Sequence, residues 1–204
     1  MRTYTMKKIQ GKPDWKKIPV MPIDNLLWTD SVDVSAKAQL CWDEEAIYVR
    51  MEAVEPHIRA KEKGPMAMVC KDSCMEFFLR PTERLDYFNI ELNPNKAIYL
   101  GFATGTHDLI RLLSGNVKKQ MKIRVYMTKK GWTLSYRVPF SFICRFFPDF
   151  KAEEGGKIYG NCYKCGDKTV KEHYLAWNPI QNDKPAFHKP EQFGCLYFGG
   201  EDID

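Results

Sequence analysis

The stretch from Ala36 to Val54, AKAQLCWDEEAIYVRMEAV, decides the fold class. Apolar residues occupy every second position before and after the acidic run Asp43-Glu44-Glu45. An alternation with a period of two is typical of a β-strand that buries one face, and the acidic run between the two halves is a turn signal. The stretch therefore predicts an antiparallel hairpin.

The same alternation recurs along most of the chain. Further strands are predicted over residues 74–79, 87–93, 97–102, 122–127, 132–139, 157–165, 173–177 and 194–198, and the one predicted helix is short and lies near Pro139 to Phe147. About nine strands in antiparallel hairpins, with long irregular connections, are typical of a sandwich. We therefore expect an all-β fold, an antiparallel β-sandwich of jelly-roll type with long loops and one short helix, in a single domain over residues 1–204.

Composition argues against several classes of partner. The net charge is +5, but the basic residues are scattered among acids and their densest groups are only pairs. A nucleic-acid footprint would require clustering on one face, so we expect no nucleic-acid partner. No apolar run approaches the ~20 residues of a membrane-spanning helix. Seven cysteines are an odd number, and no apolar segment follows the basic residues of the N-terminus, so we expect a cytoplasmic protein with reduced thiols.

Two strand-like stretches carry polar side chains in a regular row. In YFNIELN (87–93), Asn89, Glu91 and Asn93 share one face, while the apolar residues share the other. In KDSCMEFFLRP (71–81), Glu76 shares a face with Cys74, so a buried Glu76 would have to be paired or bound to a ligand. The pattern favours a ligand-facing row, whereas Asp72 and Ser73 are predicted to build the turn that enters the strand.

Five ordered motifs carry a resemblance to a known family. They are DSCMEFF (72–78), YFNIELN (87–93), GNCYK (160–164), HYLAW (173–177) and FHKPEQFG (187–194). In this order they resemble the landmarks of the family 9 carbohydrate-binding modules, in particular the stand-alone bacterial branch, from about Trp15 through Phe198. The resemblance implies a DOMON-related β-sandwich that binds a mono- or oligosaccharide and performs no catalysis itself.

Members of that family hold a terminal sugar between two tryptophan rings. By resemblance, Trp177 supplies one ring, and the other ring would fall at a position where this chain has Cys70 and its neighbours. Because a cysteine offers no flat apolar face to a pyranose, either another aromatic residue (Tyr87, Tyr163 or Tyr174) takes over, or the ligand preference has changed.

A sugar receptor needs an aromatic platform surrounded by carboxylates, amides and basic groups, because a pyranose has an apolar face and a ring of hydroxyls. The predicted ligand-binding residues supply that mixture: Glu76, Asn89, Glu91, Asn93, Asn161, Tyr163, Lys164 and Trp177. We predict no catalytic residue. Two alternatives stay open: a glycoside-processing enzyme with Glu76 and Glu91 as its carboxylate pair, and a protein-interaction sandwich that has lost sugar binding.

No metal site or cofactor is predicted from the residues. Cys162 and Cys165 have the spacing of half a zinc site, but a structural zinc needs four ligands, and this spacing on a strand sends the two thiols to opposite faces. A structural calcium ion is suggested by the family resemblance alone, and no Asp-rich loop points to one. No spacing of Met and His indicates haem. The sequence does not specify an oligomeric state.

Overall fold

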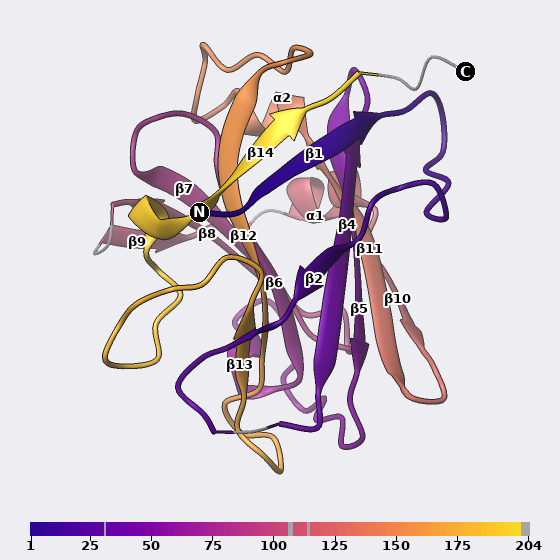
Figure 1. The fold of residues 1–204 in the computed structure, drawn as a ribbon, viewed down its shortest axis with the longest axis vertical. Coiled ribbons are helices and arrows are strands. Elements are labelled where there is room, and N and C mark those ends of the chain that lie inside the picture. Colours follow the sequence, from indigo (N-terminus) through magenta and orange to yellow (C-terminus); the bar gives the residue numbers. More distant parts are fainter. Residues whose placement is uncertain (31, 106–107, 114, 201–204) are drawn as a thin grey trace.

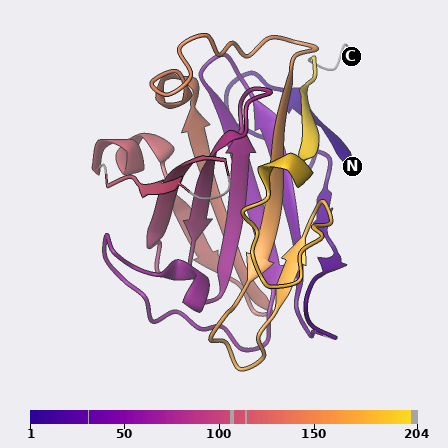
Figure 2. The same ribbon diagram turned by 90° about the vertical axis from the view of Figure 1, so that its left-hand side faces the viewer.

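The computed structural model describes residues 1–30, 32–105, 108–113 and 115–200, which form two β-sheets packed face to face (Figure 1). One sheet, called the front sheet because it faces the viewer in Figure 2, contains, in spatial order, β14 (Gly194–Phe198), β12 (Lys157–Cys165), β6 (Cys74–Arg80), β7 (Asp86–Leu92), β8 (Ile98–Thr104) and β9 (Asp108–Arg111), with the short β13 (Tyr174–Ala176) and β3 (Asn25–Leu26) beside β12. The back sheet contains β10 (Arg124–Met127), β11 (Gly131–Pro139), β5 (Ala46–Val54), β4 (Ser35–Trp42) and β2 (Met21–Ile23). The predicted all-β sandwich is confirmed.

Strand β1 (Thr3–Lys8) joins the two sheets at their common edge. Its first part runs parallel to β14, with Thr3 opposite Cys195, and its end runs parallel to β4, with Lys7 opposite Cys41. The sandwich is therefore antiparallel except along this strand. The sequence did not predict β1, whose alternation is short and lies among lysines.

The hairpin of β4 and β5 has the register that the sequence predicts. Trp42 pairs with Ile47, and the carboxylate of Asp43 accepts hydrogen bonds from the backbone N–H groups of Glu45 (2.8 Å) and Ala46 (2.9 Å). Asp43 therefore closes the turn through its side chain, as aspartate commonly does. The apolar faces of both strands contribute to the main core between the sheets.

The front sheet is covered on both of its faces. Every residue of β6 and of β7 is buried, although alternate side chains point in opposite directions. Phe77 and Ile90 belong to the main core, while Phe78 and Tyr87 belong to a second hydrophobic cluster on the outer face. This second cluster positions the candidate site.

Helices are few and short. They are α1 (Gly115–Met121), α2 (Phe140–Ile143) and two 3₁₀ turns, η1 (Val69–Lys71) and η2 (Pro190–Gln192). The helix predicted near Pro139 to Phe147 is confirmed at α2, where Phe142 packs against Phe88 with ring centroids 4.9 Å apart. The short elements β2, β3, β9 and α1 were not predicted.

A buried ionic network connects the two sheets at the C-terminal ends of β5 and β12. The Nζ of Lys164, on the inner side of β12, lies 3.2 Å from the carboxylate of Glu55, 2.7 Å from Nε2 of His173 and 2.9 Å from the carbonyl oxygen of Cys165. Glu55 also accepts hydrogen bonds from the hydroxyl of Ser73 (2.6 Å) and the indole N–H of Trp132 (3.2 Å). Each buried charge in the network has a charged or hydrogen-bonding partner, as a low-dielectric interior requires.

His173 makes the stability of the fold dependent on pH. Burial, and then the neighbouring charge of Lys164, lower the pKa of His173 to about 4. Between pH 6.5 and 4 the unfolded chain therefore takes up a proton that the folded protein does not, so stability falls as the pH falls through this window. We expect His173→Gln to shrink the difference in unfolding free energy between pH 7 and pH 5 by about 1–2 kcal/mol, measured by urea denaturation.

The exposed His57 provides the matched control for that measurement. His57→Gln should leave the difference between the two pH values unchanged. If the His173→Gln variant showed the same difference in unfolding free energy between pH 7 and pH 5 as the wild type, the prediction would be wrong. That result would mean that the imidazole of His173 in the wild type takes up a proton equally well in the folded and unfolded states.

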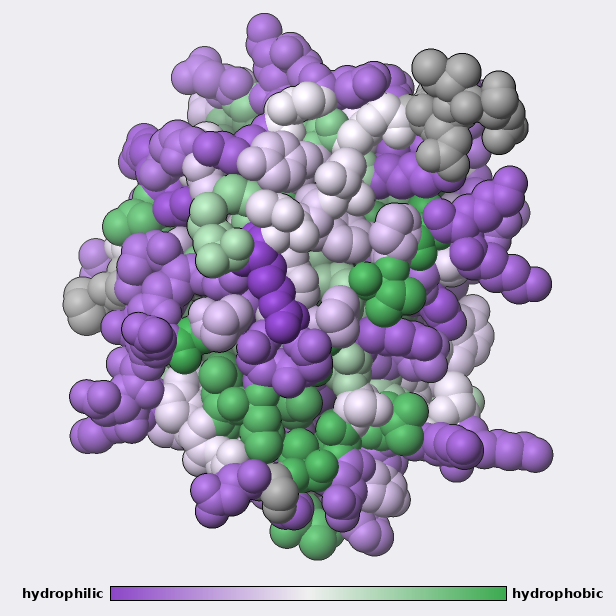
Figure 3. Space-filling model, viewed as in Figure 1, coloured by the Kyte–Doolittle hydropathy of each residue, from purple (hydrophilic) through white to green (hydrophobic). Residues whose placement is uncertain are grey.

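Most of the surface in the view of Figure 1 is hydrophilic, with hydrophobic residues gathered in its lower half (Figure 3). No helix among the described residues is long and apolar enough to cross a membrane.

Candidate functional site

The outer face of the front sheet holds a cavity of about 240 Å³. Figure 2 looks onto this face, where the gold segment between β13 and β14 crosses in front of the strands. The cavity lies between the sheet and two segments, 68–70 and 185–188, and its floor is formed by side chains of β6, β7, β8 and β12. His188 holds the second segment against the sheet, because its Nδ1 and the hydroxyl of Tyr87 are hydrogen-bonded at 2.6 Å.

Two glutamates form the floor of the pocket. Glu76 on β6 lies directly opposite Glu91 on β7, and Glu91 lies directly opposite Tyr99 on β8. The side-chain amide of Asn89 donates to Glu91 (2.7 Å), and the thiol of Cys165 donates to Glu76 (3.0 Å). The strand register therefore brings together two carboxyl groups that are widely separated in sequence.

The pocket is lined by three carboxyl groups, those of Glu76, Glu91 and Asp167, and by no lysine or arginine among the described residues. Burial, and then the charge of Glu91, raise the pKa of Glu76 well above its usual value, and burial raises the pKa of Glu91 to about 7. Burial also raises the pKa of Asp167 on the pocket wall. Arg111, whose guanidinium lies 4.3 Å from the ring centre of Tyr99, acts in the opposite direction on Glu91. Within the described part of the chain, no basic side chain forms an ion pair with either glutamate.

Aromatic side chains form one wall of the pocket. The half-buried indole of Trp28 lies 5.6 Å from the ring of Tyr174 and 5.7 Å from the ring of Phe187, and its N–H donates to the carbonyl oxygen of Asn182 (2.6 Å). Phe187 in turn stacks on Tyr163, with ring centroids 4.1 Å apart. The pocket therefore combines an aromatic wall with an acidic floor.

Trp28 is the functional candidate that the sequence analysis missed. It lies after β3 in a segment without alternation, and it holds a positive φ of 56°. A positive φ is uncommon for a bulky residue and is held in place only by surrounding contacts. Its indole could have been suspected only because large aromatics are enriched in binding surfaces.

The structure corrects the predicted place of Trp177. Its side chain is 3% exposed and belongs to the main core between the sheets. The indole ring presses against β14, where a Cβ on Gly194 would lie 2.3 Å from it. Trp177 follows β13 and turns into the sandwich, so it has no free face that a ligand could stack on. Of the aromatic replacements considered, Tyr174 lines the pocket, whereas Tyr87 and Tyr163 do not.

Lys164 and Asn161 also lie away from the pocket. Lys164 faces the interior of the sandwich, where it is fully buried against Glu55. Asn161 faces outward but is buried, and its amide bonds the backbone carbonyl (2.9 Å) and N–H (2.9 Å) of Asn178. Tyr163 lies beneath Phe187 and donates its hydroxyl hydrogen to the carbonyl oxygen of that residue (3.3 Å). None of these three predicted ligand-binding residues lines the pocket, and only Tyr163 packs against a residue of its wall.

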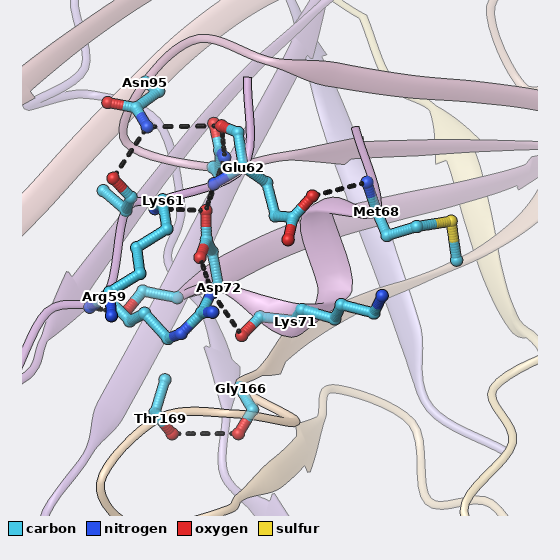
Figure 4. A network of polar contacts seen from close by, with 12 residues as sticks. Arg59, Lys61, Glu62, Met68, Lys71, Asp72, Asn95, Gly166 and Thr169 are labelled. Carbon is cyan, nitrogen blue, oxygen red and sulfur yellow. Dashed lines mark hydrogen bonds and ion pairs between the residues drawn. The ribbon is translucent and has the colours of Figure 1, made fainter. Parts of the chain in front are cut away.

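Asp72 lies at the centre of a structural corner (Figure 4), and Asn93 is bonded to it there. The buried carboxylate of Asp72 accepts hydrogen bonds from the backbone N–H groups of Lys61 (2.9 Å) and Glu62 (2.8 Å), from the amide of Asn93 (2.9 Å) and from Arg59. The prediction that Asp72 builds the entry to its strand is confirmed. Asn93 belongs to this corner, so Glu91 is the member of the predicted polar row that lines the pocket, and the fully buried Asn89 is hydrogen-bonded to it.

The comparisons with known proteins agree with this architecture. The sequence profile of carbohydrate-binding family 9 matches residues 10–198. The chain belongs to this family. This membership, which the sequence motifs also indicated, places the chain among carbohydrate-binding modules.

Solved structures show the same fold. A protein from Bacteroides uniformis ATCC 8492, described as a candidate carbohydrate-binding protein, is 25% identical and superimposes with a TM-score of 0.85 over 97% of this chain and 99% of its own. A family 9 module from Caldicellulosiruptor kristjanssonii in complex with glucose has 15% identity and a TM-score of 0.70, with coverage of 100% and 98%. The structure of such a module from the same organism with cellotriose has 13% identity and a TM-score of 0.70, with coverage of 99% and 96%. The comparison with curated proteins found no match.

Proposed function

We propose that the chain is a non-catalytic receptor for a mono- or oligosaccharide, and that the sugar enters the pocket between Trp28 and the Glu76–Glu91 floor. The observation that carries the proposal is the pairing of an aromatic wall with buried hydrogen-bonding carboxyl groups in one hollow. A pyranose has the complementary surfaces, an apolar face for the indole and hydroxyls for the carboxyl groups. Family membership and the glucose and cellotriose complexes of related modules support the same ligand class.

The volume of the pocket favours one sugar ring. At about 240 Å³ it is smaller than the ~300–1,000 Å³ typical of drug-sized ligands. A longer saccharide would therefore place one terminal ring between Trp28 and Glu91 and extend the rest past the exposed Met68 and Leu109. At about −0.3 kcal/mol per heavy atom, a disaccharide of roughly two dozen such atoms would bind with a Kd of ~10 μM.

Titration calorimetry with glucose, cellobiose, cellotriose and a broad glycan panel tests the proposal. We expect at least one neutral sugar to bind, and Trp28→Ala to weaken that binding by about 30-fold or more, because the stacking face is lost. Trp15→Ala is the matched control, since Trp15 is also half-buried but lies outside the pocket. The absence of binding across the panel, or equal affinity in the Trp28→Ala protein, would contradict the proposal.

The paired glutamates also favour a second candidate, glycoside hydrolysis. Directly opposed residues on adjacent strands have Cβ atoms about 4.5–5.5 Å apart, and a retaining glycosidase needs its carboxyl groups about 5–5.5 Å apart. A glycosidase places its two carboxyl groups on either side of the scissile bond, however, whereas Glu76 and Glu91 are neighbours on one floor. Incubation with a panel of aryl glycosides separates the two candidates: we expect no turnover, and a rate that Glu91→Gln lowers would favour hydrolysis.

A further inference from the structure

A cluster of possible metal ligands lies at and beneath the floor of the pocket. The thiols of Cys74 and Cys165 and a carboxylate oxygen of Glu76 all lie within 4.8 Å of one another, and all three residues are buried. Within the cluster, Sγ of Cys165 lies 3.0 Å from Oε1 of Glu76. We propose that Cys74, Glu76 and Cys165 bind a thiophilic divalent cation, with Zn²⁺ as the best match.

The β-ladder fixes the position of these donors. Cys74 and Glu76 are two residues apart on β6, so their side chains leave the same face of the sheet. Cys165 is the direct partner of Cys74 on the neighbouring β12. Cys162, whose spacing from Cys165 suggested half a zinc site, lies in the main core on the opposite face. The second thiol therefore comes from another strand.

The spacing of the donors fits a tetrahedral ion after small adjustments of the side chains. With Zn–S bonds of about 2.3 Å and Zn–O bonds of about 2.1 Å, tetrahedral geometry puts the donor atoms roughly 3.6–3.8 Å apart. Donors already within 4.8 Å of one another can reach these separations by side-chain rotation. Two thiolates and one carboxylate favour Zn²⁺ over Ca²⁺ or Mg²⁺, which prefer oxygen donors alone.

Further oxygen donors around the pocket favour a cation. The carboxyl groups of Glu91 and Asp167 line the same pocket as Glu76 and Cys165. Within the described part of the chain, no basic side chain forms an ion pair with Glu76 or Glu91, so no protein cation competes with a divalent ion there. On binding, Zn²⁺ would displace the thiol protons of Cys74 and Cys165, and the carboxyl proton of any protonated Glu76, to solvent, with no change of oxidation state.

An entry path and a free coordination position are present. Glu76 and Cys165 line the pocket, while Cys74 lies beneath them. Three protein ligands leave the fourth tetrahedral position facing the pocket, where water or an oxygen of the bound ligand completes the shell. All seven cysteines are unpaired, so both thiols are available as ligands.

Cobalt and zinc titrations of the reduced, full-length protein without sugar test the site. We expect one Co²⁺ per chain, with a thiolate-to-metal charge-transfer band and the visible bands of tetrahedral Co²⁺, both removed by one equivalent of Zn²⁺. Cys74→Ser, Cys165→Ser and Glu76→Gln should each raise the Kd for Zn²⁺ by about 100-fold or more. Cys144→Ser is the matched control, because Cys144 lies at the end of α2, away from the pocket, and this variant should bind like the wild type.

Several outcomes would overturn the site. One is a folded wild-type protein that gives no charge-transfer band. Another is a Cys165→Ser protein that keeps the full band and affinity. If a cysteine variant fails to fold by circular dichroism, the Glu76→Gln variant and the wild-type spectrum decide. Trp28→Ala should retain Zn²⁺ whether or not the protein binds sugar. The zinc titration therefore tests the metal site independently of the proposed sugar site, and either proposal can fail without the other.

Discussion

Replacing Trp177 by alanine is expected to lower the free energy of unfolding by about 3–5 kcal/mol, the range for deleting a large aromatic side chain from a core. The indole is buried between the sheets and lies against β14, so its removal leaves a cavity that the two rigid sheets close only in part. Denaturant unfolding followed by circular dichroism measures the loss, and the protein should show a lower midpoint with an unchanged slope.

Trp28→Ala is the matched comparison for this experiment. Trp28 is half-buried and contributes to the pocket wall, so its removal should cost less than about 1.5 kcal/mol of stability while it weakens sugar binding. A Trp177→Ala protein of wild-type stability that has lost sugar binding would contradict the structural assignment, because it would show that the indole faces the ligand.

Replacing Lys164 by methionine is expected to be about as damaging, at about 3–5 kcal/mol, because it leaves the buried carboxylate of Glu55 without its cation. Methionine retains much of the apolar stem, so the loss reports mainly on the charge. His173 loses the ammonium that its Nε2 accepts from, which adds to the effect. Urea denaturation at pH 7 measures this change in free energy.

Two further variants give that prediction its controls. Lys168→Met changes an exposed lysine in the same part of the chain and should alter stability by less than about 0.5 kcal/mol. Adding Glu55→Gln to Lys164→Met removes the orphaned charge and should recover about half of the loss. If Lys164→Met alone were neutral, the pair would contribute nothing to the native state.

Most of the sheet structure could be predicted from the alternation of apolar residues, because a strand that buries one face repeats every two positions. The hairpin of β4 and β5 and the full extent of β12 follow directly from it. The parallel pairing of β1 could not be predicted, since it depends on contacts with β14 at the far end of the sequence. The burial of both faces of β6 and β7 could be predicted only in part from the sequence. The segments that cover the outer face have no periodic pattern that would indicate where they pack.

The relative placement of candidate residues could be predicted where strand register decides it. Glu76 and Glu91 lie on adjacent strands with their side chains on the same face, as the motifs suggested. Lys164 and Asn161 are three residues apart on β12, and side chains three positions apart on a strand point to opposite faces of the sheet. The two residues could therefore not both face the ligand, and Lys164 points inward. Trp28 and the pairing of Cys74 with Cys165 depend on tertiary contacts between distant segments, which leave no periodic signal.

The bridging position of β1 has a consequence for biosynthesis. Residues 3–6 pair with residues 195–198, so β1, once translated, must wait for β14 before the edge of the sandwich can close. Until then the emerging polypeptide exposes unpaired strand edges, which are prone to aggregation. Slow translation between β1 and β14 would lengthen this interval, and chaperones that bind nascent chains would reduce the loss of yield that it causes.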